Sequence, residues 1–164
     1  MNKKLAVEIA KDILKNINKF SFQRGIYVAP KFNFSTMSME RLIITNLFHN
    51  DIVDRKCVKD LREKCNVCAL GSMIVSLAKF SKIKKKSFED RKSIVKQLAK
   101  VFHRKDINLI EDAFEANYES GSKLENFLIN LWDSNVGADE NRLNYETLKA
   151  ICQNIIDNDG RFKP

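Results

Sequence analysis

The sequence predicts a mainly α-helical protein, a single compact domain over residues 1–164 with six to seven helices. Three observations support this prediction. A chain of 164 residues is long enough for one domain that buries its own core. Five glycines and two prolines are few, so long segments carry no turn signal. Apolar residues also recur at spacings of three and four along most of the chain.

The N-terminal third holds the most regular helix and the only expected extended element. Residues 2–18 are predicted to form an amphipathic helix, since Leu5, Ile9, Ile13 and Ile17 repeat every fourth residue. Residues 20–34 alternate with a period of two and contain breakers, which favours a small extended or β element. Pro30 excludes this element from the centre of a sheet, because proline donates no backbone hydrogen bond.

The middle of the chain is expected to hold the core helix. Ser35 or Ser38 is suited to cap a helix over residues 39–49, and residues 53–64 are read as a short helix or loop. The most apolar run follows, and residues 67–80 are predicted to be a central helix. Small residues on this helix, Gly71 among them, form a seam against which another helix could pack closely. Residues 81–86 are expected to be a solvated basic connector.

Four further helices are predicted in the second half. The first opens at Ser87 with a pattern like a capping box and reaches Arg104. The second follows Asp106 as its cap. The third is short and covers residues 123–132. The last covers roughly residues 145–158, with Gly160 as a left-handed residue beyond its end. The apolar face expected for the first of these helices consists of Phe88, Ile94, Val95, Leu98, Val101 and Phe102.

The net charge of +8 is unevenly distributed. Residues 79–105 hold eleven basic and two acidic residues, whereas residues 106–146 hold two basic and ten acidic ones. Cations spaced about 6 Å apart along a helix suit a phosphate backbone. The alternative is a solvated helix face that is partly neutralised by Glu111, Glu115 and Glu119. The candidate residues for binding a partner or nucleic acid are Lys82, Lys84, Lys85, Lys86, Lys92, Lys96, Lys100 and Arg104.

The cysteines offer a second, weaker candidate. Cys65-x-x-Cys68 has the spacing of a zinc-ligand pair, and Cys57 with Cys152 would complete four sulfur ligands. The overall spacing differs from that of zinc fingers, so buried packing thiols are favoured. A nucleophilic Cys68, activated by a helix N-terminus, is a further alternative, with His103 or His49 as base. A thioredoxin-like site would need a strand before the pair, and none is expected.

Other features exclude several classes of function. No phosphate-binding glycine loop or His-Glu-x-x-His motif is present in the sequence. No apolar run approaches the roughly 20 residues that cross a bilayer, and charged residues interrupt the N-terminal apolar run that a signal peptide would need. We therefore expect a cytoplasmic protein with reduced thiols, no cofactor and no membrane partner.

Several segments resemble a group of uncharacterised small proteins of bacteria and their phages. The shared features are a Cys-x-x-Cys-Ala-x-Gly-Ala-like helix (here from Cys65), an Ile-Glu-x-Ala-Phe-Glu-like stretch (residues 110–115), a Trp-Asp loop with a later glycine, and an Asn-Ile-Ile-x-Asn-x-Gly-x-Phe-x-Pro ending. The resemblance implies a helical fold and a mobile-element context, and it brings no assigned activity. Phage proteins of this size often block or redirect a host machine, including RNA-guided nucleases of host defence.

The sequence therefore predicts a non-enzymatic interaction protein that binds a host protein or ribonucleoprotein through a basic helical face, as an inhibitor of a defence effector would. One alternative is a general accessory protein that binds nucleic acid. Another is a small zinc- or cysteine-dependent protein that uses Cys65 and Cys68.

Overall fold

The fold is mainly α-helical, as predicted, in the computed structural model, which describes residues 1–30, 51–88 and 90–164. Within these ranges the α-helices are α1 (Lys3–Asn16), α3 (Val58–Lys64), α4 (Ala69–Leu77), α5 (Arg91–Leu98), α6 (Arg104–Glu115), α7 (Lys123–Asp133) and α8 (Glu140–Asp157). The strands are β1 (Ser21–Phe22), β2 (Val28–Pro30), β3 (Ile52–Val53), β4 (Cys65–Val67) and β5 (Ile83–Lys84). Two 3₁₀ turns, η1 (Ile17–Lys19) and η2 (Lys85–Phe88), complete the described elements.

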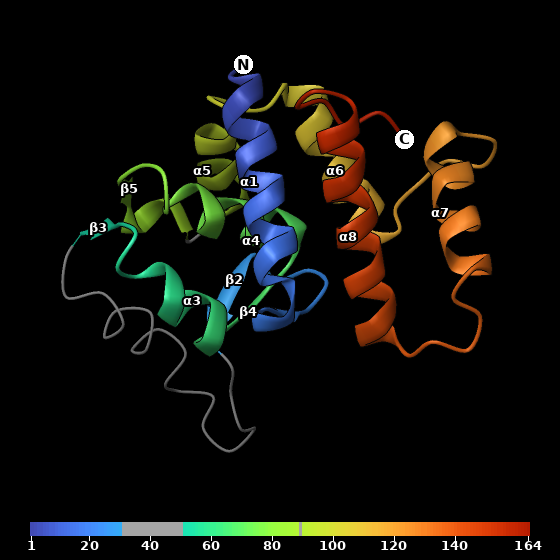
Figure 1. Ribbon diagram of the computed structural model, residues 1–164, viewed down its shortest axis with the longest axis horizontal. Helices are drawn as coiled ribbons and strands as arrows, with labels where there is room; N and C mark the ends of the chain where they lie inside the picture. Colours follow the sequence, from blue (N-terminus) through green and yellow to red (C-terminus); the bar gives the residue numbers. More distant parts are fainter. Residues whose placement is uncertain (31–50, 89) are drawn as a thin grey trace.

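Helix α4 lies at the centre of the fold. All nine of its residues are buried, and it contacts α1, α3, α5 and α6. Helices α1 and α8 run antiparallel side by side across the front of the molecule, while α7 lies at the outer edge against α6 and α8 (Figure 1). The apolar face predicted from Phe88 to Phe102 is confirmed, because all six of its residues are buried.

The strand β4 replaces the predicted start of the central helix. Residues 65–67 are extended, and α4 begins only at Ala69. The cause is tertiary, since β4 is the middle strand of a three-stranded sheet that pairs in parallel with β1 and antiparallel with β2. Helix α4 also ends at Leu77, so Phe80 lies beyond it with 41% of its surface exposed.

The extended element expected near residues 20–34 is present as β1 and β2 as far as Pro30. The strand β2 lies at an edge of the sheet, which agrees with the limit that its proline imposes. Residues 31–34 and the helix predicted over 39–49 lie outside the described residues. Residues 81–86 are more ordered than a solvated connector, because β5 pairs with β3 and Ile83 is buried.

Two helix starts differ from the prediction. Helix α5 begins at Arg91, and its cap is Asp90, whose carboxylate accepts the Ser93 backbone N–H at 2.9 Å. Ser87 instead lies in η2. Helix α8 begins at Glu140, earlier than expected, because Asp139 caps it. In both cases an aspartate side chain accepts a backbone N–H of the first helical turn and so sets where the helix begins.

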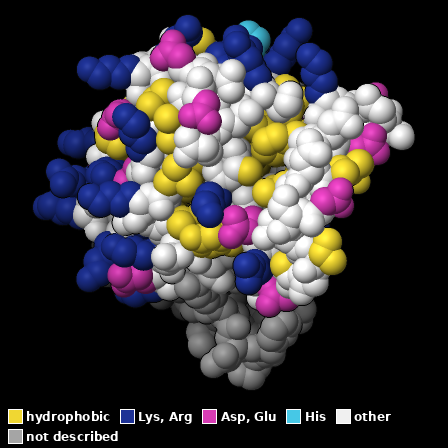
Figure 2. Space-filling view, turned by 45° about the vertical axis from the view of Figure 1, so that its right-hand side comes forward, with side chains coloured by type: hydrophobic (Ala, Val, Ile, Leu, Met, Phe, Trp, Pro, Cys, Tyr) yellow, Lys and Arg dark blue, Asp and Glu magenta, His cyan; other side chains and the backbone are white. Residues whose placement is uncertain are grey.

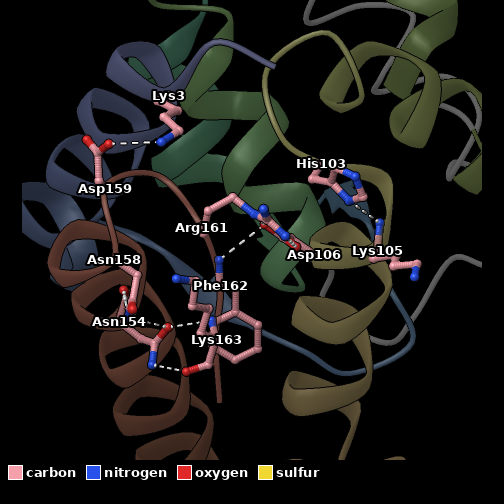
Figure 3. Close-up of polar contacts among 10 residues, drawn as sticks. All are labelled: Lys3, His103, Lys105, Asp106, Asn154, Asn158, Asp159, Arg161, Phe162 and Lys163. Carbon is pink, nitrogen blue, oxygen red and sulfur yellow. Dashed lines mark hydrogen bonds and ion pairs between the residues drawn. The ribbon is translucent and has the colours of Figure 1, made fainter.

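Asp106 anchors the C-terminal segment and does not cap α6. The cap of α6 is His103, whose Nδ1 accepts the Lys105 backbone N–H. Asp106 lies in the first turn, almost fully buried, and its two carboxylate oxygens receive the Arg161 guanidinium (Figure 3). The Phe162 backbone N–H also donates to this carboxylate, at 3.3 Å. The last residues are thereby fixed against α6, and the Phe162 ring is buried.

Two glycines permit close approaches of the backbone. Gly160 has a φ of 84°, as predicted for a residue that follows the helix, and a Cβ there would lie 2.7 Å from the Lys3 carbonyl oxygen. At Gly71 a Cβ would lie 1.5 Å from the carbonyl oxygen of Tyr27. The segment that packs closely against the small residue Gly71 is therefore the one that leads into β2, and not another helix.

Within the described ranges, no helix is both long enough and apolar enough to cross a lipid bilayer.

We predict that Gly71→Ala destabilises the protein by about 3 kcal/mol or more, because α4 and the Tyr27 backbone must move apart. Gly121→Ala is the control, since its Cβ meets no atom within 4 Å and only its φ of 78° is strained. That strain costs about 1 kcal/mol. Chemical denaturation measures both losses, and an equal loss in the two variants would contradict the close approach.

We predict that Asp106→Asn lowers the free energy of unfolding by about 2 kcal/mol, because it removes charged hydrogen bonds to Arg161. It should also accelerate amide hydrogen exchange at Phe162 and Lys163. Asp159→Asn is the control, since its ion pair with Lys3 is exposed at both ends and contributes about 0.5 kcal/mol or less. Unchanged exchange at Phe162 in Asp106→Asn would show that the carboxylate does not hold the segment.

Candidate partner-binding surface

The eight candidate cations lie on four successive elements, β5, η2, α5 and α6, or directly beside them. Residues 82–86 occupy β5, η2 and the residue before them, and η2 packs against α5. Lys92 and Lys96 lie on α5, one turn apart, and Lys100 lies in the turn that follows this helix. Arg104 is the first residue of α6. We call this set, from Lys82 to Arg104, the basic segment.

The predicted single row of cations along one helix is wrong beyond Lys96. Helix α5 ends at Leu98, and the chain then turns so that Val101 and Phe102 enter the core. His103 is extended, with φ −70° and ψ 139°, and α6 starts after it. Lys100 and Arg104 therefore do not continue the helical row. Burial of two large apolar side chains determined where the helix ends, and no local breaker in the sequence marks that point.

The cations of the basic segment are directed to solvent. Seven are exposed, and Lys85 is half-buried. The seven candidate cations other than Lys85 form no ion pair with a carboxylate in the part of the chain that the structure describes. Lys100 donates a hydrogen bond to the Gln97 side chain at 2.7 Å. Figure 2 shows Lys and Arg side chains gathered along the left edge and across the top of one face, with hydrophobic side chains in its middle.

The acidic residues of α6 bind other partners within the chain. Glu111 receives the Arg91 Nε–H at 2.8 and 2.9 Å and the Tyr27 hydroxyl at 2.7 Å. Glu115 accepts the Gly25 backbone N–H at 2.9 Å, and burial raises the pKa of its carboxyl group. Helix α6 ends at Glu115, since Ala116 is left-handed. Glu119 therefore lies beyond the helix that carries Glu111 and Glu115. The basic residue that Glu111 binds is Arg91, which is not one of the eight candidate cations.

The Cys65–Cys68 pair is part of the core. Cys65 lies in β4 and Cys68 at the cap position of α4, and both are buried. The strand β4 begins at Cys65 itself, and helix α3 is the element that precedes the pair. Burial raises the pKa of the Cys68 thiol to about 12, against two weaker lowering contributions from backbone N–H groups of α4. The prediction that the helix N-terminus lowers this pKa is therefore wrong, because desolvation is the larger effect.

The cysteines are not gathered around a metal site. Cys57 is partly exposed, Cys152 is fully buried in α8, and burial raises the pKa of the Cys152 thiol. Among the described residues, which include all four cysteines, no group of three or more His, Cys, Asp or Glu side chains could hold a metal ion. His103 caps α6, and His49 lies outside the described residues. The described residues therefore provide no set of ligands for the zinc alternative.

A second group of cations, which the sequence did not single out, meets near α3. Asp12 of α1 is almost fully buried, and it pairs with Arg62 of α3 and with Lys79 at 2.7 Å. Arg62 and Lys79 also line a hollow with Lys19, Arg55, Lys59 and Val58. These residues come from three separate segments. The only signal in the sequence was the excess of positive charge in residues 1–82, which contains no information on their proximity.

The sequence matches no protein-family model, and neither a curated protein nor a solved structure shows significant similarity to it.

We predict that a thiol reagent such as Ellman's reagent modifies only Cys57 rapidly in the folded protein. Cys65, Cys68 and Cys152 should react only upon unfolding, because burial excludes the reagent and the raised pKa of Cys68 and Cys152 suppresses the thiolate. Cys57→Ser is the control, which should lose the rapid phase. Rapid modification of Cys68 in that variant would restore the nucleophile hypothesis.

Proposed function

We propose that this protein is a non-catalytic interaction protein that binds a nucleoprotein of a host cell through its basic segment. The observation that carries the proposal is the set of exposed cations on β5, α5 and the start of α6 that have no carboxylate partner among the described residues. Exposed cations that no described carboxylate neutralises are suited to an anionic partner. A phosphate backbone is the polyanion that they fit best.

The composition of the basic segment favours contact with phosphates over reading of bases. Seven of its eight cations are lysines, which act as flexible point charges and do not provide the planar, bidentate donors of arginine. Base stacking would require aromatic side chains among the cations. The only aromatic residues between Lys82 and Arg104 are Phe88 and Phe102, and both are buried. Binding should therefore depend strongly on salt and weakly on nucleotide sequence.

The mobile-element context remains a proposal that rests on the resemblance of the Cys65 motif and the C-terminal sequence to small phage proteins. In that context the partner would be a ribonucleoprotein of host defence, bound stoichiometrically. The general nucleic-acid-binding alternative shares the same cations and differs in its partner, because naked RNA or DNA would then bind as tightly as a nucleoprotein.

The cysteine-dependent alternative loses its main support. Its nucleophile would be Cys68, which is buried and has a raised pKa. A reactive cysteine needs an accessible thiolate.

The experiment is a pull-down of the tagged protein from a bacterial lysate, with and without nuclease treatment, followed by mass spectrometry. We expect a protein complex that is retained without nuclease and is lost or weakened after nuclease and at high salt. Retention of nucleic acid alone would favour the general alternative. Retention of a protein partner that is indifferent to nuclease and salt would contradict the role assigned to phosphate contacts.

We predict that Lys92→Glu combined with Lys96→Glu weakens retention of the partner at least tenfold, as expected when two phosphate contacts become repulsive. The matched control is Lys123→Glu combined with Lys149→Glu, which changes the net charge equally on α7 and α8. Retention is measured at two salt concentrations. An equal loss in both double variants would show that net charge, and not the basic segment, drives binding.

A further inference from the structure

The hollow beside α3 is lined almost entirely by cations. Its volume is about 150 Å³, and its lining consists of Lys19, Arg55, Val58, Lys59, Arg62 and Lys79. Five of these six residues are basic, and they come from η1, the segment before α3, α3 itself and the turn after α4. The space exceeds what one water molecule needs. Such a concentration of like charge is unfavourable unless an anion shares the space.

The carboxylates nearby leave most of this charge uncompensated. Asp12 pairs with Arg62 and Lys79. Asp60 on α3 faces Lys64 at 3.4 Å, and Asp54 accepts the Lys56 backbone N–H at 2.9 Å. No ion pair to a described carboxylate holds Lys19, Arg55 or Lys59. Among the described residues, the hollow therefore combines five cations with one buried carboxylate, that of Asp12.

Arg62 provides a donor that the rest of the described chain does not use. The residue is 7% exposed, and its Nε is buried without a hydrogen-bond partner among the described residues. One terminal nitrogen binds Asp12 and lies 3.5 Å from Ser76 Oγ, and the guanidinium stacks over the Phe20 ring at 5.5 Å. The guanidinium is thus held in place, while a buried N–H without a partner is costly.

The charge of Arg62 persists despite its burial. Desolvation lowers the pKa of its guanidinium, and the charge and hydrogen bond of Asp12 raise it. Arginine stays protonated at neutral pH.

From this geometry we infer that the hollow is a binding site for a phosphate group, bound by the cations that line it, Lys19, Arg55, Lys59, Arg62 and Lys79. A tetrahedral oxyanion presents several acceptors to cations that converge from different directions, which suits phosphate better than a single carboxylate. The site is separate from the basic segment, and it does not depend on the nucleoprotein proposal.

The test is a titration with inorganic phosphate at constant ionic strength, observed by the Nε–H resonance of Arg62 in proton–nitrogen correlation spectra. We expect a saturable shift of this resonance at millimolar phosphate. Parallel titrations with a nucleoside 5′-monophosphate and the corresponding nucleoside distinguish free phosphate from a phosphate ester. The ester should compete with phosphate, whereas the nucleoside should not. No shift of the Arg62 resonance with either phosphate source would overturn the proposal.

The test variant replaces exposed cations and leaves the Asp12–Arg62 pair intact. Lys19→Gln, Arg55→Gln and Lys59→Gln together should weaken phosphate binding at least tenfold, about 1.4 kcal/mol. The control is Lys4→Gln, Lys123→Gln and Lys149→Gln, which removes the same charge outside the hollow and should change the affinity by less than about twofold. If both triple variants lost phosphate affinity equally, net charge would explain the binding, and the proposal of a phosphate site in the hollow would be overturned. Unfolding curves establish that both variants are folded.

Discussion

Complete burial of α4 is the constraint on which the rest of this structure depends. A helix without a polar face is stable only when other elements cover it on all sides, and α1, α3, α5 and α6 do so here. Small residues on α4 allow its neighbours to pack closely, and the Tyr27 backbone lies directly against Gly71. The Ser72 hydroxyl donates to the Ala69 carbonyl oxygen of the same helix at 2.7 Å, so it needs no partner outside α4. The charged residues are consequently displaced to the surrounding elements, where they pair across the fold or face solvent.

Arginines and lysines differ in which of these two environments they occupy: several arginines pair across the fold, whereas most lysines face solvent. Three arginines join elements that are distant in sequence: Arg62 binds Asp12, Arg91 binds Glu111, and Arg161 binds Asp106. The planar guanidinium binds a carboxylate through two nitrogens in the Arg161 pair, which gives a fixed geometry. The basic segment, in contrast, is made mostly of lysines that remain in solvent. The positive charge that the sequence shows as one block is therefore partly structural, and the lysines are the part that faces solvent.

The cysteine motif shows why residue spacing alone is a weak guide to chemistry. Cys65 and Cys68 have a spacing that suits metal or redox sites, and Cys68 does stand at a helix N-terminus after a strand. Both side chains are nevertheless enclosed by the core, where desolvation outweighs the stabilisation that a helix N-terminus gives to a thiolate. The hollow near α3 is the opposite case. Its cations are scattered along the first half of the sequence, and only the packing of α1, α3 and α4 brings them together.

The sequence by itself determined the mainly helical fold, the buried face from Phe88 to Phe102, and the left-handed Gly160. These features follow from side-chain periodicity and local backbone preference, which depend on residues a few positions apart. Only the tertiary structure decided that residues 65–67 form a strand, that α5 ends at Leu98, and which carboxylate each arginine binds. The reason is physical, because β4 needs strand partners about 40 residues away, and the α5–α6 turn is set by burial of Val101 and Phe102. Contacts of this range leave no periodic trace in the chain.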